Sequence, residues 1–290
     1  MQVRIMKFLI QTETLPTTIK NAGVINVKSV VAFFFGWVSL VSRVVAKRWQ
    51  PRLLFIVGLA SISACSGLPN NLKMDDQGNY IGLLVVYDER ESNENKSTFQ
   101  TSIRILPHRM LISDNRNSSG YLLVDRQKHI IYNINKDDKT IMVIKSRAVS
   151  APSPIKIDYS MKSQPSGAIP KVATFKATHY EIDVNGKHCY DTVSGGNDFL
   201  PDVTAALSEF RQIMAGEHAK SVTRIPKDMI DACDLALNIY HPVDHMKNGF
   251  PLREWGRHGY MRFIKFWKEN EKIEPQALEL PTGYETYSIP

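Results

Sequence analysis

Three cysteines carry most of the chemistry available to this sequence: Cys65, Cys189 and Cys233. A thiol can be acylated, paired in a disulfide or bound to a metal ion, and its surroundings favour one of these outcomes. Before Cys65, basic residues precede an apolar run of about 12 residues, which ends in small residues. This run is too short to span a bilayer as a mature helix. The pattern predicts a signal peptide that ends at a cysteine.

The residues around Cys65 also match a more specific pattern. Ile62-Ser63-Ala64-Cys65 resembles the bacterial lipobox, the site at which lipoprotein signal peptides are cut. The resemblance implies that Cys65 becomes the N-terminus, carries lipid on its sulfur and amino group, and anchors the chain in the envelope of a Gram-negative bacterium, facing the periplasm. Ser66 stands where enteric inner-membrane lipoproteins tend to have Asp, which favours the outer membrane by analogy. The alternative is a buried core strand that ends in Cys.

The segment before the signal is unusually long for this interpretation. We expect residues 45–64 to be the signal peptide and residues 65–79, which are polar and rich in Gly, Pro and Asn, to be a tether. Residues 1–44 are then either an over-extended start, which we favour, or a real cytoplasmic or membrane extension. The apolar stretch 30–40 within them is short for a spanning helix.

The basic charge of the chain belongs to this leader. Eight of the 36 basic residues and one of the 29 acidic residues precede Cys65, so the remainder has 28 of each. The sequence pI of about 9.2 therefore gives no argument for nucleic-acid binding. We expect no nucleic-acid partner.

Export also bears on the other two cysteines. If Cys65 carries lipid, Cys189 and Cys233 are an even pair in a compartment where disulfides persist, and we predict that they are bonded. Two free buried thiols are the alternative. A zinc site is a weaker one, because neither cysteine has a second Cys or His at ligand spacing.

The strands and helices expected after the tether form a single domain, residues 80–290. Strands with period-2 patterning recur through the first half, and Asn185-Gly186 predicts a tight hairpin. A helix is expected with a start signal at Asp198 or at Pro201-Asp202 and a stop near Gly216, and a second helix over 228–240. The expected strands are 80–87, 98–106, 110–112, 121–124, 129–134, 140–144, 155–157, 173–184, 188–193, 250–252, 260–267 and 286–289.

Three of these segments resemble segments of a known protein family. The strand Asn185-Gly-x-x-Cys189, the entry Gly249-Phe-Pro-Leu252 and the ending Leu278-Glu-Leu-Pro-Thr-Gly-Tyr284 resemble uncharacterised envelope lipoproteins related to the LolA/LolB lipoprotein-carrier fold. The similarity covers residues 98–289. It implies an α+β, mostly β fold: an open, curved antiparallel sheet of about ten strands, with two or three helices on its concave face and an apolar cavity between them. The family has no active site to transfer, so we expect neither catalytic residues nor a cofactor.

Large apolar side chains near the second half of the chain are the candidates for lining such a cavity. Those expected to do so are Phe210, Met214, Trp255, Tyr260, Phe263 and Trp267. In residues 260–267, apolar side chains occur on both faces of the expected strand. This fits a strand with core on one face and a cavity or helix on the other. A strand buried on both sides without a cavity is the alternative.

Histidines give two weaker candidates for metal binding. His241 and His245 have helical i, i+4 spacing, but Pro242 argues for a loop. His179 and His188 are expected as cross-strand neighbours in a surface pair. We therefore expect no metal site.

Two functions are compatible with these features. In the first, the lipid-anchored domain binds a hydrophobic ligand, such as an acyl chain or the lipid of a lipoprotein, in the cavity of the sheet. In the second, it is a non-enzymatic scaffold that binds another envelope protein through a sheet edge or through a flap formed by residues 146–170. In both cases the lipid on Cys65 anchors the protein in the membrane, which is therefore an expected partner.

Overall fold

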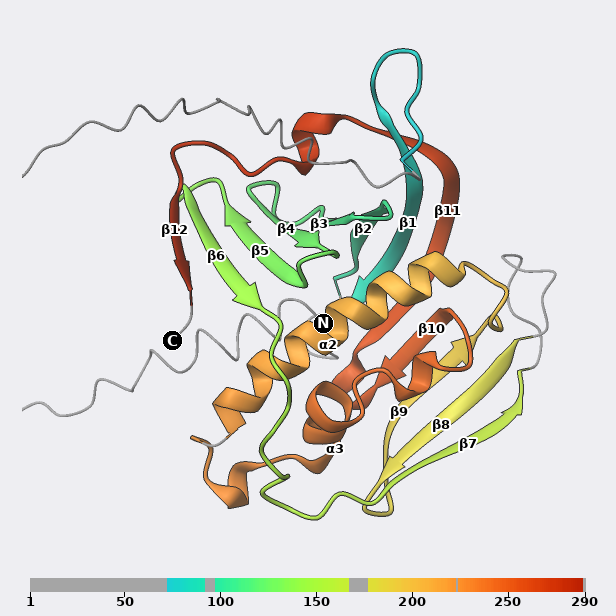
Figure 1. Ribbon diagram of the computed structural model, residues 1–290. Helices are drawn as coiled ribbons and strands as arrows, with labels where there is room; N and C mark the ends of the chain where they lie inside the picture. Colours follow the sequence, from blue (N-terminus) through green and yellow to red (C-terminus); the bar gives the residue numbers. More distant parts are fainter. Residues whose placement is uncertain (1–71, 92–96, 167–176, 223, 289–290) are drawn as a thin grey trace, which may run out of the picture. The chain divides into compact units, whose positions relative to one another are not determined.

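The structure is a computed structural model, and it describes residues 72–91, 97–166, 177–222 and 224–288 (Figure 1). These residues belong to one compact unit, Gly67–Pro290. The predicted leader, the signal peptide, Cys65 and the first part of the tether lie outside the described residues, as do the end of the expected flap, 167–170, and the start of the expected strand 173–184.

Twelve strands of the described chain form one sheet, so the prediction of an open, mostly antiparallel sheet is confirmed. The two edges are different strands that do not meet, and the sheet is visibly curved (Figure 1). In chain order the strands are β1 (Tyr80–Arg90), β2 (Phe99–Ile105), β3 (Arg109–Asp114), β4 (Gly120–Asp125), β5 (Ile130–Asn135), β6 (Thr140–Lys145), β7 (Tyr159–Pro165), β8 (Thr178–Val184), β9 (Lys187–Ser194), β10 (Pro251–Gly256), β11 (Met261–Ile273) and β12 (Glu285–Ser288).

The topology joins two halves through β1. Strands β1 to β6 form a meander, and β11, β10, β9, β8 and β7 continue the sheet on the other side of β1. All pairings are antiparallel except that of β12, which adds to β6 in parallel. The hairpin at Asn185-Gly186 is confirmed, because both residues have positive φ (51° and 72°) between the paired residues Val184 and Lys187.

The predicted long helix is α2 (Pro201–Val222), which crosses the concave side and contacts β5 and β6 (Figure 1). We call the face of the sheet toward α2 the inner face and the opposite one the outer face. The prediction that the helix ends near Gly216 is wrong, because α2 continues to Val222. A Cβ at this position would collide with the backbone carbonyl of Arg147, so the glycine permits a close approach of the chain after β6 rather than ending the helix.

The second predicted helix is broken into short pieces. These are the 3-10 turn η1 (Lys227–Met229), α3 (Ala232–Leu235) and the π turn η2 (Ala236–Tyr240). Asp231 caps α3 by accepting hydrogen bonds from the backbone N–H groups of Cys233 and Asp234. This cap fixes where α3 begins and so places Cys233. Two further 3-10 turns are η3 (Asp244–Met246) and η4 (Arg257–Gly259).

Part of the expected tether is folded. Leu72 packs against a cluster that includes Ile134 and Leu278, and the latter comes from the 3-10 turn η5 (Pro275–Leu278). Met74 bridges to Tyr80, and the carboxylate of Asp75 pairs with Lys272 at 2.8 Å. Residues 72–79 therefore belong to the domain.

One expected strand needs correction. Residues 155–157 are not a strand; the strand in that region is β7, which begins at Tyr159. Ile155 and Ile157 instead cover Val222, Leu235 and Ile239 as part of a small apolar cluster. Within the described residues, no helix has the length and apolar character needed to cross a membrane.

Candidate functional site

The Cys189–Cys233 disulfide is confirmed. It joins β9 to α3 with a Cα–Cα distance of 5.5 Å, and both residues are buried. Around it pack Ile182, Val184, Tyr190 and Ala236. The bond ties β9, an interior strand of the sheet, to the broken helical segment.

A β-bulge next to this disulfide decides which side chains share a face. The pairing of β8 with β9 shifts by one residue between Ile182 and Asp183, so Ile182 pairs with Tyr190 and Glu181 pairs with Asp191. Cys189 and Tyr190 both pack into the inner cluster as a result. The next residue, Asp191, is thereby moved to the outer face.

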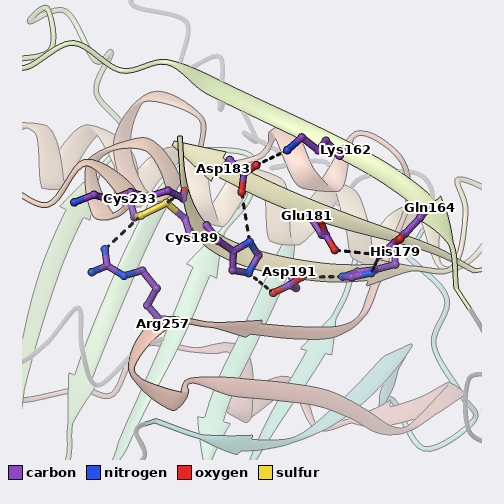
Figure 2. A network of polar contacts seen from close by, with 11 residues as sticks. Lys162, Gln164, His179, Glu181, Asp183, Cys189, Asp191, Cys233 and Arg257 are labelled. Carbon is purple, nitrogen blue, oxygen red and sulfur yellow. Dashed lines mark hydrogen bonds and ion pairs between the residues drawn. A yellow bond between two sulfur atoms is a disulfide. The ribbon is translucent and has the colours of Figure 1, made fainter. Parts of the chain in front are cut away.

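The outer face of β7 to β10 carries a polar network, which Figure 2 shows from close by. His179 Nε2 lies 2.8 Å from Asp191 Oδ1, and His188 Nε2 lies 2.7 Å from Asp191 Oδ2. Gln164 Nε2 contacts His179 Nδ1 at 2.9 Å and donates to Glu181 Oε1 at 3.1 Å. The predicted pairing of His179 and His188 is thus indirect, through one buried carboxylate between them.

Three members of this network offer ligand atoms close together. The nearest donor atoms of His179, Glu181 and Asp191 all lie within 4.8 Å of one another. No other group of three such residues occurs in the part of the chain that the structure describes. One imidazole nitrogen and two carboxylate oxygens are a donor set that fits a divalent metal ion.

The other histidine candidate does not form a site. His241 pairs with Asp244 at 2.7 Å and stacks on Tyr159, whereas His245 is fully buried and lies 3.5 Å from Glu254. The two rings therefore have separate partners, and the loop expected from Pro242 is present.

The inner face at β10 holds a buried ionic cluster that the sequence did not reveal. Glu254 pairs with Arg262 and, at 3.0 Å, with Arg211 from α2, and it accepts a 2.5 Å hydrogen bond from Tyr190. Burial alone would raise the pKa of Glu254, but the two guanidinium groups hold it well below its usual range. Burial, helped by the positive charge of Arg211, lowers the pKa of His245 to about 4.

Two tyrosines complete this polar interior. The hydroxyl groups of Tyr87 and Tyr260 are buried and have no hydrogen-bond partner among the described residues. Burial raises the pKa of both. The guanidinium of Arg262 lies 4.4 Å from the ring centre of Tyr87.

The six side chains expected to line one cavity do not lie together. Phe210 and Met214 are buried on α2. On β10 and β11, Glu254 and Arg262 point inward, so their neighbours Trp255 and Phe263 point outward. Trp267 contacts Phe199 edge-on at 5.0 Å, and Tyr260 lies near Tyr190.

The expectation that residues 260–267 avoid water on both faces is also wrong. Phe263 is 39% exposed and Phe266 is 43% exposed. With the half-buried Trp255 and Met261 they form what we call the aromatic patch, on the outer face beside the polar network.

Comparison with known proteins does not assign this chain to a family. The sequence matches no protein-family model and no curated protein. Among solved structures, an uncharacterized conserved protein from Thermus thermophilus aligns with a TM-score of 0.39 and 8% identity, over 72% of this chain and 91% of that chain.

Two structures of PNGF-II, in different space groups, align with TM-scores of 0.35 and 0.33 at 9% and 8% identity. Each alignment covers 72% of this chain, but only 32% and 31% of PNGF-II. At these scores the alignments carry no argument about function, and the resemblance to lipoprotein carriers stays a prediction.

Proposed function

We propose that the chain is an exported protein, anchored by lipid on Cys65 in the bacterial envelope, whose domain is a non-enzymatic module that binds another envelope protein. The observation that carries this proposal is the Cys189–Cys233 disulfide. Disulfides persist in exported proteins and are rare in the cytosol. The bond uses two of the three cysteines and leaves Cys65, the one in the lipobox-like sequence, for acylation.

The anchor would keep the domain close to the membrane. Leu72, the first described residue, is seven residues after Cys65 and is packed against the core. Seven residues span at most about 25 Å even when fully extended. A partner of this domain is therefore expected to be at or near the membrane surface.

The distribution of charge favours a protein partner over an acyl chain inside the sheet. On the inner face between α2 and β9 to β11, Glu254, Arg211 and Arg262 are buried and charged. An acyl chain placed there would lie against ionised groups and would replace none of their contacts. Exposed aromatic side chains are instead found outside, in the aromatic patch. Aromatic residues are enriched at protein–protein interfaces.

A site-specific cross-linking experiment in intact cells tests this proposal. A photo-reactive phenylalanine analogue is placed at position 266 in the aromatic patch, or at position 287 on β12 as a control that is similarly exposed. We expect one cross-linked protein from position 266, none from position 287, and loss of the product when Phe263→Ser is added. Equal products from both positions would contradict the proposal.

The carrier alternative is tested on the same protein. After purification from membranes, native mass spectrometry shows whether a lipid is retained in addition to the acyl groups on Cys65. We expect no additional lipid. Retention of one lipid per chain would support the carrier and overturn the binding-module proposal.

A further inference from the structure

The outer face of β8 and β9 brings two carboxylates together, and Lys162, which is opposite Glu181 on β7, pairs with Asp183 at 2.8 Å. Glu181 and Asp191 are directly opposite each other across the two strands. Like charges at opposed positions in a sheet destabilise the pairing, and Asp191 is also largely buried, with a side chain 7% exposed. His179 and His188 contact Asp191 but supply positive charge only when protonated.

We propose that His179, Glu181 and Asp191 bind one zinc ion. Their ligand atoms already lie within 4.8 Å of one another. Zinc ligands at about 2.0–2.2 Å from the ion are separated by about 3.3–3.6 Å in a tetrahedral site, so small rotations of the three side chains suffice. Three protein ligands leave a fourth position, which a water molecule would take.

The donor set selects the class of metal. Calcium and magnesium prefer sites made of oxygen atoms alone and take six or more ligands. A site with one imidazole and two carboxylates suits zinc and similar borderline ions. Zinc binding by these residues requires neither the proposed lipid anchor nor the proposed protein partner.

Each proposed ligand is supported by a second side chain. Gln164 contacts both His179 and Glu181, and His188 holds the second oxygen of Asp191. The ring of Trp255 stacks on His179, with ring centres 5.2 Å apart, and fixes the orientation of the imidazole. Outer partners of this kind orient the ligands in metal sites.

The β-bulge in β8 and β9 also favours a site at this position. In a regular hairpin from Asn185-Gly186, Asp191 would be opposite Tyr180 and would point to the inner face. The shift between Ile182 and Asp183 places it opposite Glu181 instead. Bulges are frequent next to functional sites, where they re-aim a side chain.

Binding would rearrange hydrogens in a defined way. In the metal-free network, His179 Nε2 donates to Asp191, and Nδ1 accepts from the amide of Gln164. When zinc takes Nε2, the single ring proton leaves this nitrogen and Nδ1 is protonated by exchange with solvent, so the imidazole stays neutral and no net proton is released. Gln164 must then turn its amide so that Oε1 accepts from Nδ1.

Calorimetric titration of the full-length protein, purified in detergent without a polyhistidine tag and treated with chelator, tests the proposal. We expect zinc chloride to bind with one equivalent per chain and calcium chloride not to compete. Glu181→Gln keeps the size and the contact with Gln164 but removes a charged ligand, and should lower the affinity about tenfold or more, as should Asp191→Asn. Absence of zinc binding, or equal affinities in these variants, would overturn the proposal.

The matched control is His241→Gln. It removes a histidine that also pairs with a carboxylate, Asp244, but has no third ligand close by among the described residues. We expect unchanged affinity; an equal loss would show that zinc binds to scattered surface histidines. Because the variants could be misfolded, cobalt titration of the wild-type protein gives an independent readout. Visible absorption bands that saturate at one equivalent support the site, and their absence contradicts it.

Discussion

Glu254 and Trp255 are neighbours on β10 but lie on opposite faces of the sheet. Glu254 is fully buried against Arg211 of α2, whereas Trp255 stacks on His179 of the outer polar network. Because successive side chains of β10 point to opposite faces, this short strand contributes both to the ionic interior and to the outer face with the proposed zinc site and the aromatic patch. Substitutions on the two faces should therefore have separate effects.

Removing the charge of Glu254 should be strongly destabilising. Glu254→Gln leaves Arg211 and Arg262 buried without their carboxylate, and breaking a buried ion pair in this way typically costs about 3–5 kcal/mol. Glu285→Gln, on the exposed strand β12, is the control and should change stability by less than about 0.5 kcal/mol. Urea unfolding measures both. A small effect of Glu254→Gln would contradict the buried cluster.

His245 should make the protein less stable in acid. Its pKa falls from 6.5 to about 4 on folding, so the unfolded chain binds more protons between these values and stability is lost as pH falls through that window. The neighbouring Glu254 favours the protonated ring, but burial outweighs it. The contribution amounts to about 3 kcal/mol. His245→Gln should flatten the dependence of unfolding free energy on pH between 4 and 6.5; an unchanged slope would argue against a buried neutral ring.

Loss of the disulfide should destabilise the domain as a whole. The bond closes a loop with a sequence separation of 44, for which chain entropy predicts about 3–4 kcal/mol. Replacing both cysteines, as Cys189→Ser with Cys233→Ser, avoids leaving a single reactive thiol. Thermal unfolding of this variant is compared with that of the oxidised wild type. Equal melting temperatures would show that the bond contributes no stability.

The position of Phe266 on the exposed outer face of β11 can be tested by comparing substitutions of two phenylalanines. Phe266 is 43% exposed and Phe250 is fully buried against Tyr87 and Phe199. Phe266→Ser should therefore change the free energy of unfolding by no more than about 0.5 kcal/mol. Phe250→Ala should cost about 3–5 kcal/mol. Similar losses in both variants would place Phe266 in the core.

Much of the fold could be predicted because local signals and tertiary structure agree. The meander between residues 121 and 144 has alternating apolar residues and short polar turns, and Asn185-Gly186 has the positive φ angles that its composition favours. The cysteine pair followed from an even count in a chain predicted to be exported. The helix α2 was predicted from its 3.6-residue period. The helix end predicted at Gly216 was wrong, because the glycine is there to let a distant segment, at Arg147, pack closely against the helix.

The candidate site could not be predicted for a specific reason. His179 and Glu181 have the spacing of one strand face, and this signal was present in the sequence. The third ligand, Asp191, reaches that face only through the bulge in the β8–β9 hairpin, and a regular register would have placed it on the opposite side. Glu254 was missed similarly, since its partners Arg211 and Arg262 come from α2 and β11.

The proposed anchoring of the domain depends on lipid attached to Cys65, and metabolic labelling with palmitate measures this attachment. Cells that express the wild-type chain are compared with cells that express Cys65→Ala. We predict that the wild-type protein carries label and fractionates with membranes, whereas the variant carries none, although Cys189 and Cys233 are intact. An unlabelled wild-type protein, or equal labelling of the two, would contradict the account.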